Sequence, residues 1–123
     1  MKKISKPVLI KKLIKENDRL YQEIGRQTYN KCFFGCNSYS CLHHFILKSQ
    51  SLNTRYNIKN GIPICVKHHC SIHMGQNSEL EGKIVLKLGE KWFKDLIKRK
   101  HIIITNKLDF LQKENIRLKK LLN

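Results

Sequence analysis

Apolar side chains recur along the first part of the chain at alternating spacings of three and four residues. The positions in this stripe are Ile10, Leu13, Asn17, Leu20 and Ile24. Because an α-helix has about 3.6 residues per turn, this spacing places them on one face of an amphipathic helix. We therefore predict a helix over residues 7–27, with Gly25 as its C-terminal stop.

The last third of the chain shows the same periodicity in two segments. Residues 90–100 place large apolar side chains on one side, at Trp92, Phe93, Leu96 and Ile97. A final stripe consists of Leu108, Leu111, Asn115, Leu118 and Leu122. Both segments are predicted to be helical.

Asn17 and Asn115 each interrupt an otherwise apolar stripe. A coiled coil uses a single Asn in such a position to fix its register. Two arrangements are compatible with this pattern: each terminal helix packs on the core as an ordinary amphipathic helix, or the helices form a zipper between two copies of the chain and make a homodimer. Each stripe covers roughly two to three heptads, fewer than coiled coils usually need, which favours packing on the core.

Residues 28–75 lack this periodicity and are rich in Asn, Ser and Gly, which indicates loops and short strands. The run 42–47 is a candidate strand, and residues 62–64 lead into a turn. A short helix is predicted over residues 68–74, ending at Gly75. The sequence therefore predicts an α+β fold. Its parts are a basic N-terminal helical arm (1–27), a Cys/His core (28–75) and a C-terminal helical region with a possible short coiled coil (76–123).

Size and charge narrow the class of protein. A core of about 50 residues is near the lower limit for a self-sufficient hydrophobic core, so a metal is expected to brace it. The chain of 123 residues has 25 Lys and Arg against 9 Asp and Glu, a formal net charge of +16. Such an excess favours binding to a polyanion, nucleic acid first and an anionic membrane second.

The sequence also indicates the cellular compartment in which the protein is expected. It has no run of about 18 apolar residues, so we expect no transmembrane helix and no membrane partner. The residues after Met1 are interrupted by Lys11 and Lys12 and do not form the apolar region of a signal peptide. The number of cysteines is odd, at five, which fits reduced metal ligands better than disulfides. We therefore expect a cytoplasmic protein.

Potential metal ligands are concentrated between Cys32 and His73. This stretch holds all five cysteines and five of the six histidines. No Asp or Glu occurs between Thr28 and Gly75. The absence of carboxylates disfavours a site made of oxygen ligands and favours ions that prefer sulfur and imidazole.

Two ligand pairs predict a structural zinc site. Zinc takes four N or S ligands in a tetrahedron, and closely spaced pairs supply them without strain. Gly35 allows the backbone to turn around the ion. The expected ligands are Cys32, Cys36, Cys65 and His68. Two substitutions in this set stay open, because Cys41 can replace Cys36 and Cys70 can replace His68.

A second group of histidines adjoins this set. His69 and His73 are four residues apart, so on a helix they leave the same face one turn apart and can grip a divalent ion. His43 and His44 are adjacent, so on a strand they point to opposite faces. One of them can therefore bind a metal while the other does different chemistry. Asn60 lies between the two pairs in the sequence.

In this order and at these spacings, the residues resemble the HNH (ββα-metal, His-Me finger) endonuclease family. The pattern that carries the resemblance is Cys32-x3-Cys36, His43-His44, Asn60 and Cys65-x2-His68-His69-x3-His73. The run 62–69 is similar to small phage-borne members, and the resemblance covers roughly residues 28–75, less than half of the chain. It implies a zinc-stapled ββα-metal core, flanked by the amphipathic helices, that hydrolyses phosphodiester bonds in DNA.

The resemblance implies a role for each matching residue. His44 would be the general base that activates water, and Asn60 would help to orient that base and the hairpin. His43, His69 and His73 would hold one catalytic divalent metal. Many family members place a carboxylate at this metal, whereas this core has none. The ion is therefore open among Mg, Mn, Ni and Zn, with imidazole ligands favouring Zn, Ni or Mn.

Basic residues within the core are candidate phosphate contacts. Arg55 is the strongest single candidate, because a guanidinium in the loop between His44 and Asn60 can clamp a phosphate through two hydrogen bonds. The others are Lys48, Lys59 and Lys67. Such contacts give affinity without reading sequence, and no recognition helix stands out, so we expect weak sequence preference on DNA.

The leading hypothesis is a small metal-dependent DNA endonuclease, encoded by a phage or a mobile element and, if by a phage, acting in the host-cell cytoplasm. The alternative is a zinc-stapled nucleic-acid-binding protein without catalysis. A third hypothesis is a zinc-stapled interaction protein that dimerises through its helices. The three differ in whether cleavage requires His44 and in whether DNA binding depends on salt.

Overall fold

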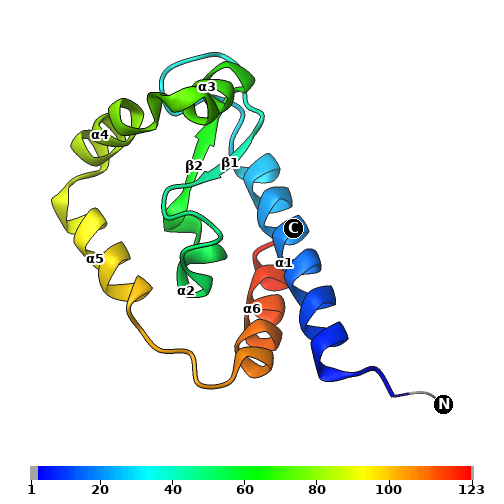
Figure 1. The fold of residues 1–123 in the computed structure, drawn as a ribbon. Helices are drawn as coiled ribbons and strands as arrows, with labels where there is room; N and C mark the ends of the chain where they lie inside the picture. Colours follow the sequence, from blue (N-terminus) through cyan, green and yellow to red (C-terminus); the bar gives the residue numbers. More distant parts are fainter. Residues whose placement is uncertain (1–2, 123) are drawn as a thin grey trace.

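The protein has an α+β structure in which helices surround a two-stranded sheet (Figure 1). The computed structural model describes residues 3–122, apart from the side chain of Gln76. The strands are β1 (Cys41–His44) and β2 (Gly61–Ile64). The remaining elements are the helices α1 (Lys6–Thr28), α2 (Leu52–Arg55), α3 (Val66–Ser71), α4 (Asn77–Leu88), α5 (Glu90–Lys100) and α6 (Lys107–Leu121), with two turns, η1 (Ile58–Asn60) and η2 (Ile72–Gln76). The α+β prediction is confirmed.

β1 and β2 form an antiparallel hairpin, and α3 follows β2 after a single residue. In the register of the hairpin, Cys41 is opposite Ile64 and His44 is opposite Gly61. The strand predicted over 42–47 ends early, at His44. Beyond it, the N–H of Phe45 still donates to the backbone carbonyl of Asn60, but both backbone groups of Ile46 are bonded by the Asn60 side chain instead of by a partner strand.

The hairpin lies between two hydrophobic clusters, because helices cover both of its sides (Figure 1). The cluster toward α4 and α5 contains Cys32, Phe45, Ile46, Ile62, Ile64, Cys65, Ile72, Leu80, Ile84 and Leu96. The cluster toward α1 and α6 contains Leu20, Tyr21, Ile24, Leu42, Tyr56, Leu111 and Leu118. The buried strand β2 therefore reads as a continuous apolar run instead of an alternating one.

The helix predicted over residues 7–27 is α1, but Gly25 does not end it. The helix continues to Thr28, and Gly25 is buried inside it. A Cβ atom at this position would lie 2.4 Å from the hydroxyl of Tyr39 and 2.6 Å from Cγ of Leu42. Gly25 is therefore needed for the close approach of β1 to α1, and its prediction as a helix stop was wrong.

α1 and α6 lie side by side and bury their apolar stripes against each other (Figure 1). The two lone Asn residues meet in this interface, where the amide of Asn115 donates to Oδ1 of Asn17 at 2.9 Å. The amide of Asn17 donates in turn to the carbonyl of Leu111 at 3.1 Å. The pair thus fixes a register, as in a coiled coil, but within one chain. The homodimer through these helices stays a prediction.

The C-terminal half matches the predicted helices closely. α5 spans residues 90–100, and α6 carries the final stripe. The helix predicted over residues 68–74 begins earlier, with α3 at Val66, and passes into the wide turn η2. Gly75 has φ of +95° in that turn and separates α3 from α4 as expected, because few other residues adopt this conformation.

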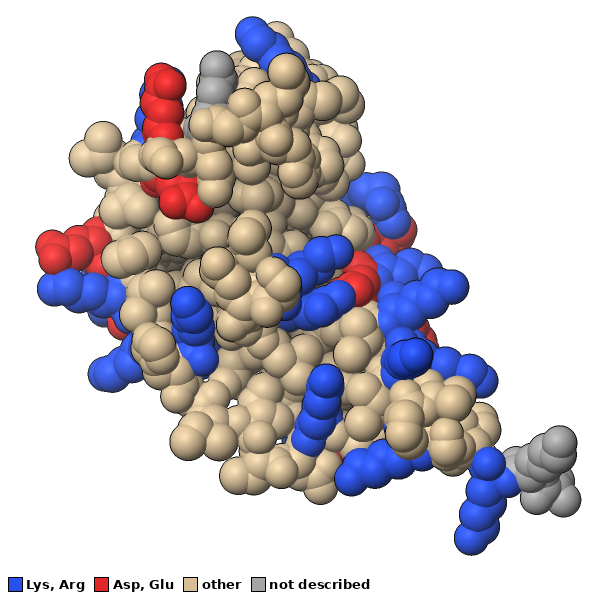
Figure 2. Space-filling view, viewed as in Figure 1, with Lys and Arg blue, Asp and Glu red and all other residues tan. Residues whose placement is uncertain are grey.

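The surface carries the positive charge that the composition indicates. On the face in Figure 2, Lys and Arg side chains follow the α1 side and continue across the middle, whereas acidic side chains gather toward α4. Basic side chains therefore predominate on the α1 side of this face. No helix in residues 3–122 is both long and apolar enough to cross a bilayer.

We expect Asn17→Ala to lower the free energy of unfolding by about 1–3 kcal/mol, because it leaves the buried amide of Asn115 and the carbonyl of Leu111 without partners. The double variant Asn17→Leu/Asn115→Leu replaces both polar groups with apolar ones, so it should be closer to the wild type. Urea unfolding measures both variants. Equal midpoints for Asn17→Ala and the wild type would contradict this account of the helix pair.

Candidate functional site

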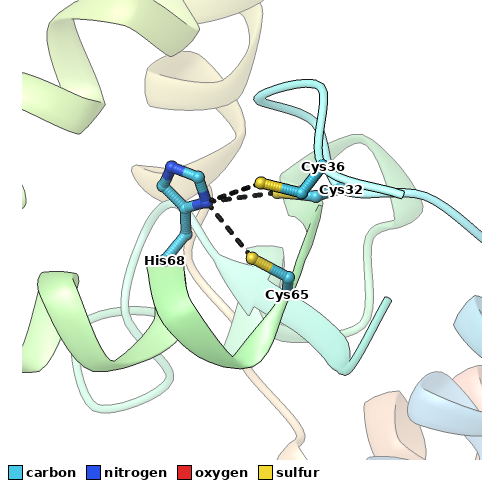
Figure 3. A group of neighbouring side chains, drawn as sticks. All are labelled: Cys32, Cys36, Cys65 and His68. Carbon is cyan, nitrogen blue, oxygen red and sulfur yellow. Dashed lines mark hydrogen bonds between the residues drawn. The ribbon is translucent and has the colours of Figure 1, made fainter. Parts of the chain in front are cut away.

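Four potential metal ligands converge next to α3, and they are the four predicted for zinc (Figure 3). Cys32 and Cys36 come from the loop after α1, Cys65 precedes α3, and His68 lies in its first turn. Nδ1 of His68 is 3.5, 3.6 and 3.2 Å from the sulfurs of Cys32, Cys36 and Cys65, respectively. All four ligand atoms lie within 4.8 Å of one another.

These separations fit one tetrahedral ion. Bonds of about 2.3 Å to sulfur and about 2.05 Å to nitrogen imply S···N distances of roughly 3.6 Å in a tetrahedron. The three observed distances lie at or slightly below this value. Three thiols and one imidazole are also the soft donor set that zinc prefers to Mg or Ca. The group can therefore hold a zinc ion.

Local backbone structure brings the ligands together. The N–H of Gly35 donates to the carbonyl of Cys32, and the N–H of Cys32 donates to the carbonyl of Cys36. Gly35 has φ of +95°, so the predicted use of glycine in this turn is confirmed. Cys65 caps the N-terminus of α3, and His68 follows it by three residues on the first helical turn. The ring of Phe34 stacks on His68 at 4.6 Å between centroids and limits its rotation.

The thiol environment favours a thiolate at Cys65. Burial raises the pKa of Cys65, but hydrogen bonds from the backbone and ring of His68 and from the neighbouring thiols outweigh it and lower the pKa to about 6. The hydrogen bond with Cys65, burial and the neighbouring thiols raise the pKa of Cys36. A bound metal ion would displace the thiol protons.

Cys41 and Cys70 lie outside the group. Cys41 therefore does not replace Cys36, and Cys70 does not replace His68, among the four gathered ligands. Cys41 lies on β1, and Cys70 is exposed on α3. Within residues 3–122, the Cys3His group is the only set of three or more Cys, His, Asp or Glu side chains whose ligand atoms gather this closely.

His69 and His73 form a second, smaller pair on the exposed side of α3 and η2. Their Nε2 atoms lie 2.9 Å apart, and their rings meet edge to face. Two imidazole nitrogens bound about 2.1 Å from one ion at a right angle would lie roughly 3.0 Å apart. Burial, and then the charge of His73, lower the pKa of His69. The two ring nitrogens thus lie at a separation that suits one divalent ion.

His43 lies near this pair without joining it. Burial lowers the pKa of His43 to about 4, and His44, His69 and His73 act in the same direction. The ring therefore feels both members of the pair, but its nitrogens are outside the distance that defines the Cys3His group. Of the three histidines predicted to share an ion, His69 and His73 are in direct contact, and the ligand nitrogens of His43 are not gathered with theirs. The three-His metal site stays a prediction.

His44 points to the other side of β1, toward α1, as expected for adjacent strand residues. Its ring stacks on Tyr21 with centroids 4.8 Å apart, and its Nε2 lies 2.8 Å from the carbonyl oxygen of Arg55. Burial lowers the pKa of His44 to about 4, with Lys48 acting in the same direction and the bond to the Arg55 carbonyl opposing it. His44 is therefore neutral at pH 7.

The contact between Tyr21 and His44 explains why residue 61, which is paired with His44 in the hairpin, is a glycine. A Cβ atom at Gly61 would lie 2.4 Å from the hydroxyl of Tyr21, which donates to the carbonyl of Asn57. A larger residue at this position would push Tyr21 off His44. No sequence pattern predicts this contact, because Tyr21 comes from α1, outside the Cys/His core.

Asn60 braces the loop between the strands. Its Oδ1 accepts from the N–H of Ile46 at 2.7 Å, and its amide donates to the carbonyls of Ile46 and Thr54. The side chain is fully buried. Because these bonds tie the end of β1 to α2, Asn60 acts on the hairpin, and it reaches His44 only through the backbone of residues 54–55.

Arg55 makes a contact that was not expected. Its Nε and Nη2 donate to the two carboxylate oxygens of Asp18 at 2.9 and 2.7 Å. The core has no carboxylate of its own, but α1 supplies one. A phosphate clamp through the same two nitrogens would require Asp18 to leave. The predicted contact residues Lys48, Lys59 and Lys67 are all exposed.

Zinc removal should destabilise the protein strongly. We expect Cys36→Ser to reduce zinc from one per chain to well below half and to lower Tm by roughly 10 °C or more, because bound metal contributes folding free energy. Cys41→Ser is the matched control and should keep both values near wild type. Metal analysis of purified protein and thermal unfolding measure the effect. Full zinc content in Cys36→Ser would exclude Cys36 as a ligand.

Comparison with known proteins found no family model, no curated protein and no solved structure that matches the chain. Function must therefore be argued from the side chains and their geometry.

Proposed function

We propose that the protein is a metal-dependent DNA endonuclease with a zinc-braced ββα-metal core. The observation that carries the proposal is that the two adjacent histidines of β1, His43 and His44, have different surroundings. His43 lies in the neighbourhood of the His69–His73 pair, while His44 is held separately with one nitrogen fixed on a backbone carbonyl. A hydrolytic site needs these two parts, a place for an ion and a base beside it.

The tautomer of His44 suits a general base. A carbonyl oxygen can only accept a hydrogen bond, so the contact with Arg55 places the ring proton on Nε2. Nδ1 then carries the lone pair and can take a proton from water. Stacking on Tyr21 holds the ring in this orientation. Transfer of that proton to Nδ1 would leave a hydroxide to attack phosphorus.

His69 and His73 would hold the divalent ion, with His43 as the third ligand. When bound, the ion would supply positive charge to a phosphate oxygen and to the leaving oxygen. The positive side chain of Lys48, which acts on the His44 ring, would add attraction for the scissile phosphate. Asn60 would keep the hairpin loop, and hence the Arg55 carbonyl, in place.

The Cys3His group supports this chemistry from a distance. His68 and His69 are neighbours on α3, so an ion that fixes His68 against Cys32 and Cys36 also fixes the direction of His69. The zinc would therefore hold the His69–His73 pair facing β1. This separation of a closed structural site from an open catalytic site is usual for metalloenzymes.

The second candidate is a zinc-stapled nucleic-acid-binding protein without catalysis. It is favoured by one observation, that the ligand nitrogens of His43 are not gathered with those of His69 and His73. In that case the His69–His73 contact is a plain N–H···N hydrogen bond. A cleavage assay separates the two functions.

We expect the wild-type protein to nick plasmid or single-stranded DNA in the presence of Mg, Mn, Ni or Zn. His44→Ala should lower the rate by about 10²–10⁴-fold, the usual contribution of a general base, with unchanged DNA affinity and zinc content. His101→Ala is the matched control, because His101 is exposed at the end of α5. If the DNA stays intact with every metal, the endonuclease proposal is refuted and the non-catalytic nucleic-acid-binding protein is the remaining candidate.

His73→Ala should behave differently from His44→Ala. His73 is exposed, so its loss should leave the fold intact and weaken only the metal site. We expect its cleavage rate to recover when the metal concentration is raised, whereas the rate of His44→Ala stays low at every concentration. Metal titrations of both variants measure this contrast. If neither variant responds to metal, His73 is not a ligand.

A further inference from the structure

A cleft of about 730 Å³ lies between α5 and the turn η1. It is separate from the Cys3His group and from the His69–His73 pair, and none of those residues lines it. Its lining residues are Asn57, Lys59, Leu88, Lys91, Trp92, Asp95, Leu96, Lys98, Arg99 and Ile102. A cleft of this volume is large enough for a nucleotide-sized ligand.

The charge of the cleft is predominantly positive. Its cations are Lys59, Lys91, Lys98 and Arg99, and its one carboxylate is Asp95. Salt bridges on the neighbouring surfaces join other residues, such as Lys94 with Glu90 and Lys83 with Glu79. Within residues 3–122 the four cations of the cleft have no carboxylate within salt-bridge distance, so their charge is available to an anion.

Trp92, the single tryptophan of the chain, forms part of the wall. Its Nε1 donates to the carbonyl of Lys59 at 2.9 Å, which joins the two sides of the cleft. Its ring packs at 68° against Phe45, with centroids 4.9 Å apart. These contacts fix the ring while leaving it only half-buried. The cleft thus combines a rigid aromatic ring with unpaired cations.

We infer that this cleft binds an unpaired strand of nucleic acid, with a base against Trp92 and the flanking phosphates on Lys59, Lys91, Lys98 and Arg99. Bases of a duplex are stacked on each other and cannot offer a face to an aromatic ring, whereas an unpaired base can. A groove that pairs aromatic stacking with cations along the backbone is typical of single-strand binding.

The cleft adjoins the proposed catalytic hairpin through the backbone. Lys59 precedes Asn60, and Phe45, on which Trp92 packs, follows His44. A strand in the cleft would therefore pass close to the end of β1. The inference shares with the proposed function only the premise that the ligand is nucleic acid, and it does not require cleavage.

Binding of a short oligothymidylate to the full chain tests the inference. We expect the fluorescence of Trp92 to fall on binding, because a thymine base stacked on the ring would quench it. The fluorescence anisotropy of a labelled oligomer gives the affinity. Lys91→Gln/Lys98→Gln should weaken binding about 25-fold at 0.1 M salt and reduce the salt slope by about 1.4. The matched control, Lys83→Gln/Lys113→Gln, loses the same charge outside the cleft and should stay within a fewfold of wild type.

Two further pairs of variants test the cleft and distinguish loss of binding from misfolding. Asp95→Asn removes the carboxylate from the cleft and should tighten binding, a gain that a damaged fold cannot produce, whereas Glu79→Gln on α4 should have little effect. Trp92→Leu should weaken binding about 5- to 150-fold, the range for loss of one stacked base, and Trp92→Phe should retain most of it.

The outcomes separate this inference from the proposed function. Equal affinities for the cleft and control double variants, or unchanged Trp92 fluorescence on binding, would overturn the inference even if DNA is cleaved. Preference for a duplex over the oligothymidylate would overturn it as well. Binding in the cleft by wild type and His44→Ala alike, without cleavage by either, would sustain the inference and refute the endonuclease.

Discussion

The convergence of three thiols and one imidazole on one point is the contact on which the arrangement of this protein depends. It joins the loop after α1 to the start of α3 across the buried strand β2. Without a shared ion, only weak hydrogen bonds between the thiols and the His68 ring would join these segments, which are rich in Asn, Ser and Gly. This group of ligands therefore sets the direction of α3, and with it the direction of His69 and His73.

A second constraint comes from α1, which crosses the opposite side of the hairpin. Tyr21 stacks on His44, and Asp18 holds Arg55, whose carbonyl accepts from the His44 ring. α1 is in turn held by α6 through the buried Asn17–Asn115 pair. His44, the last residue of β1, is thus oriented by elements from both ends of the chain. This explains why so small a core has long helical extensions, since they supply apolar surface that the core lacks.

Much of the molecule was predictable from local pattern. The stripes at spacings of three and four located α1, α5 and α6, and the paired spacing of Cys and His located the metal group, because both follow from the geometry of one helix or one turn. Gly75 was predicted for the same reason, since its positive φ is a local property. Gly25 was misread because its role is a contact with β1, which no local pattern encodes.

Residue type and spacing are enough to predict the helical stripes, the net charge, the candidate ligands of the metal group and the opposite directions of His43 and His44. Other features follow only from the packing of the folded chain. Cys36 and His68 join the metal group while Cys41 and Cys70 do not, and the two lone Asn residues meet within one chain. Asp18 accepts both hydrogen bonds from the Arg55 guanidinium, and Trp92 shares a cleft with unpaired cations. The physical reason is that these pairings join residues far apart in the sequence, and only the packing of whole elements brings them within bonding distance.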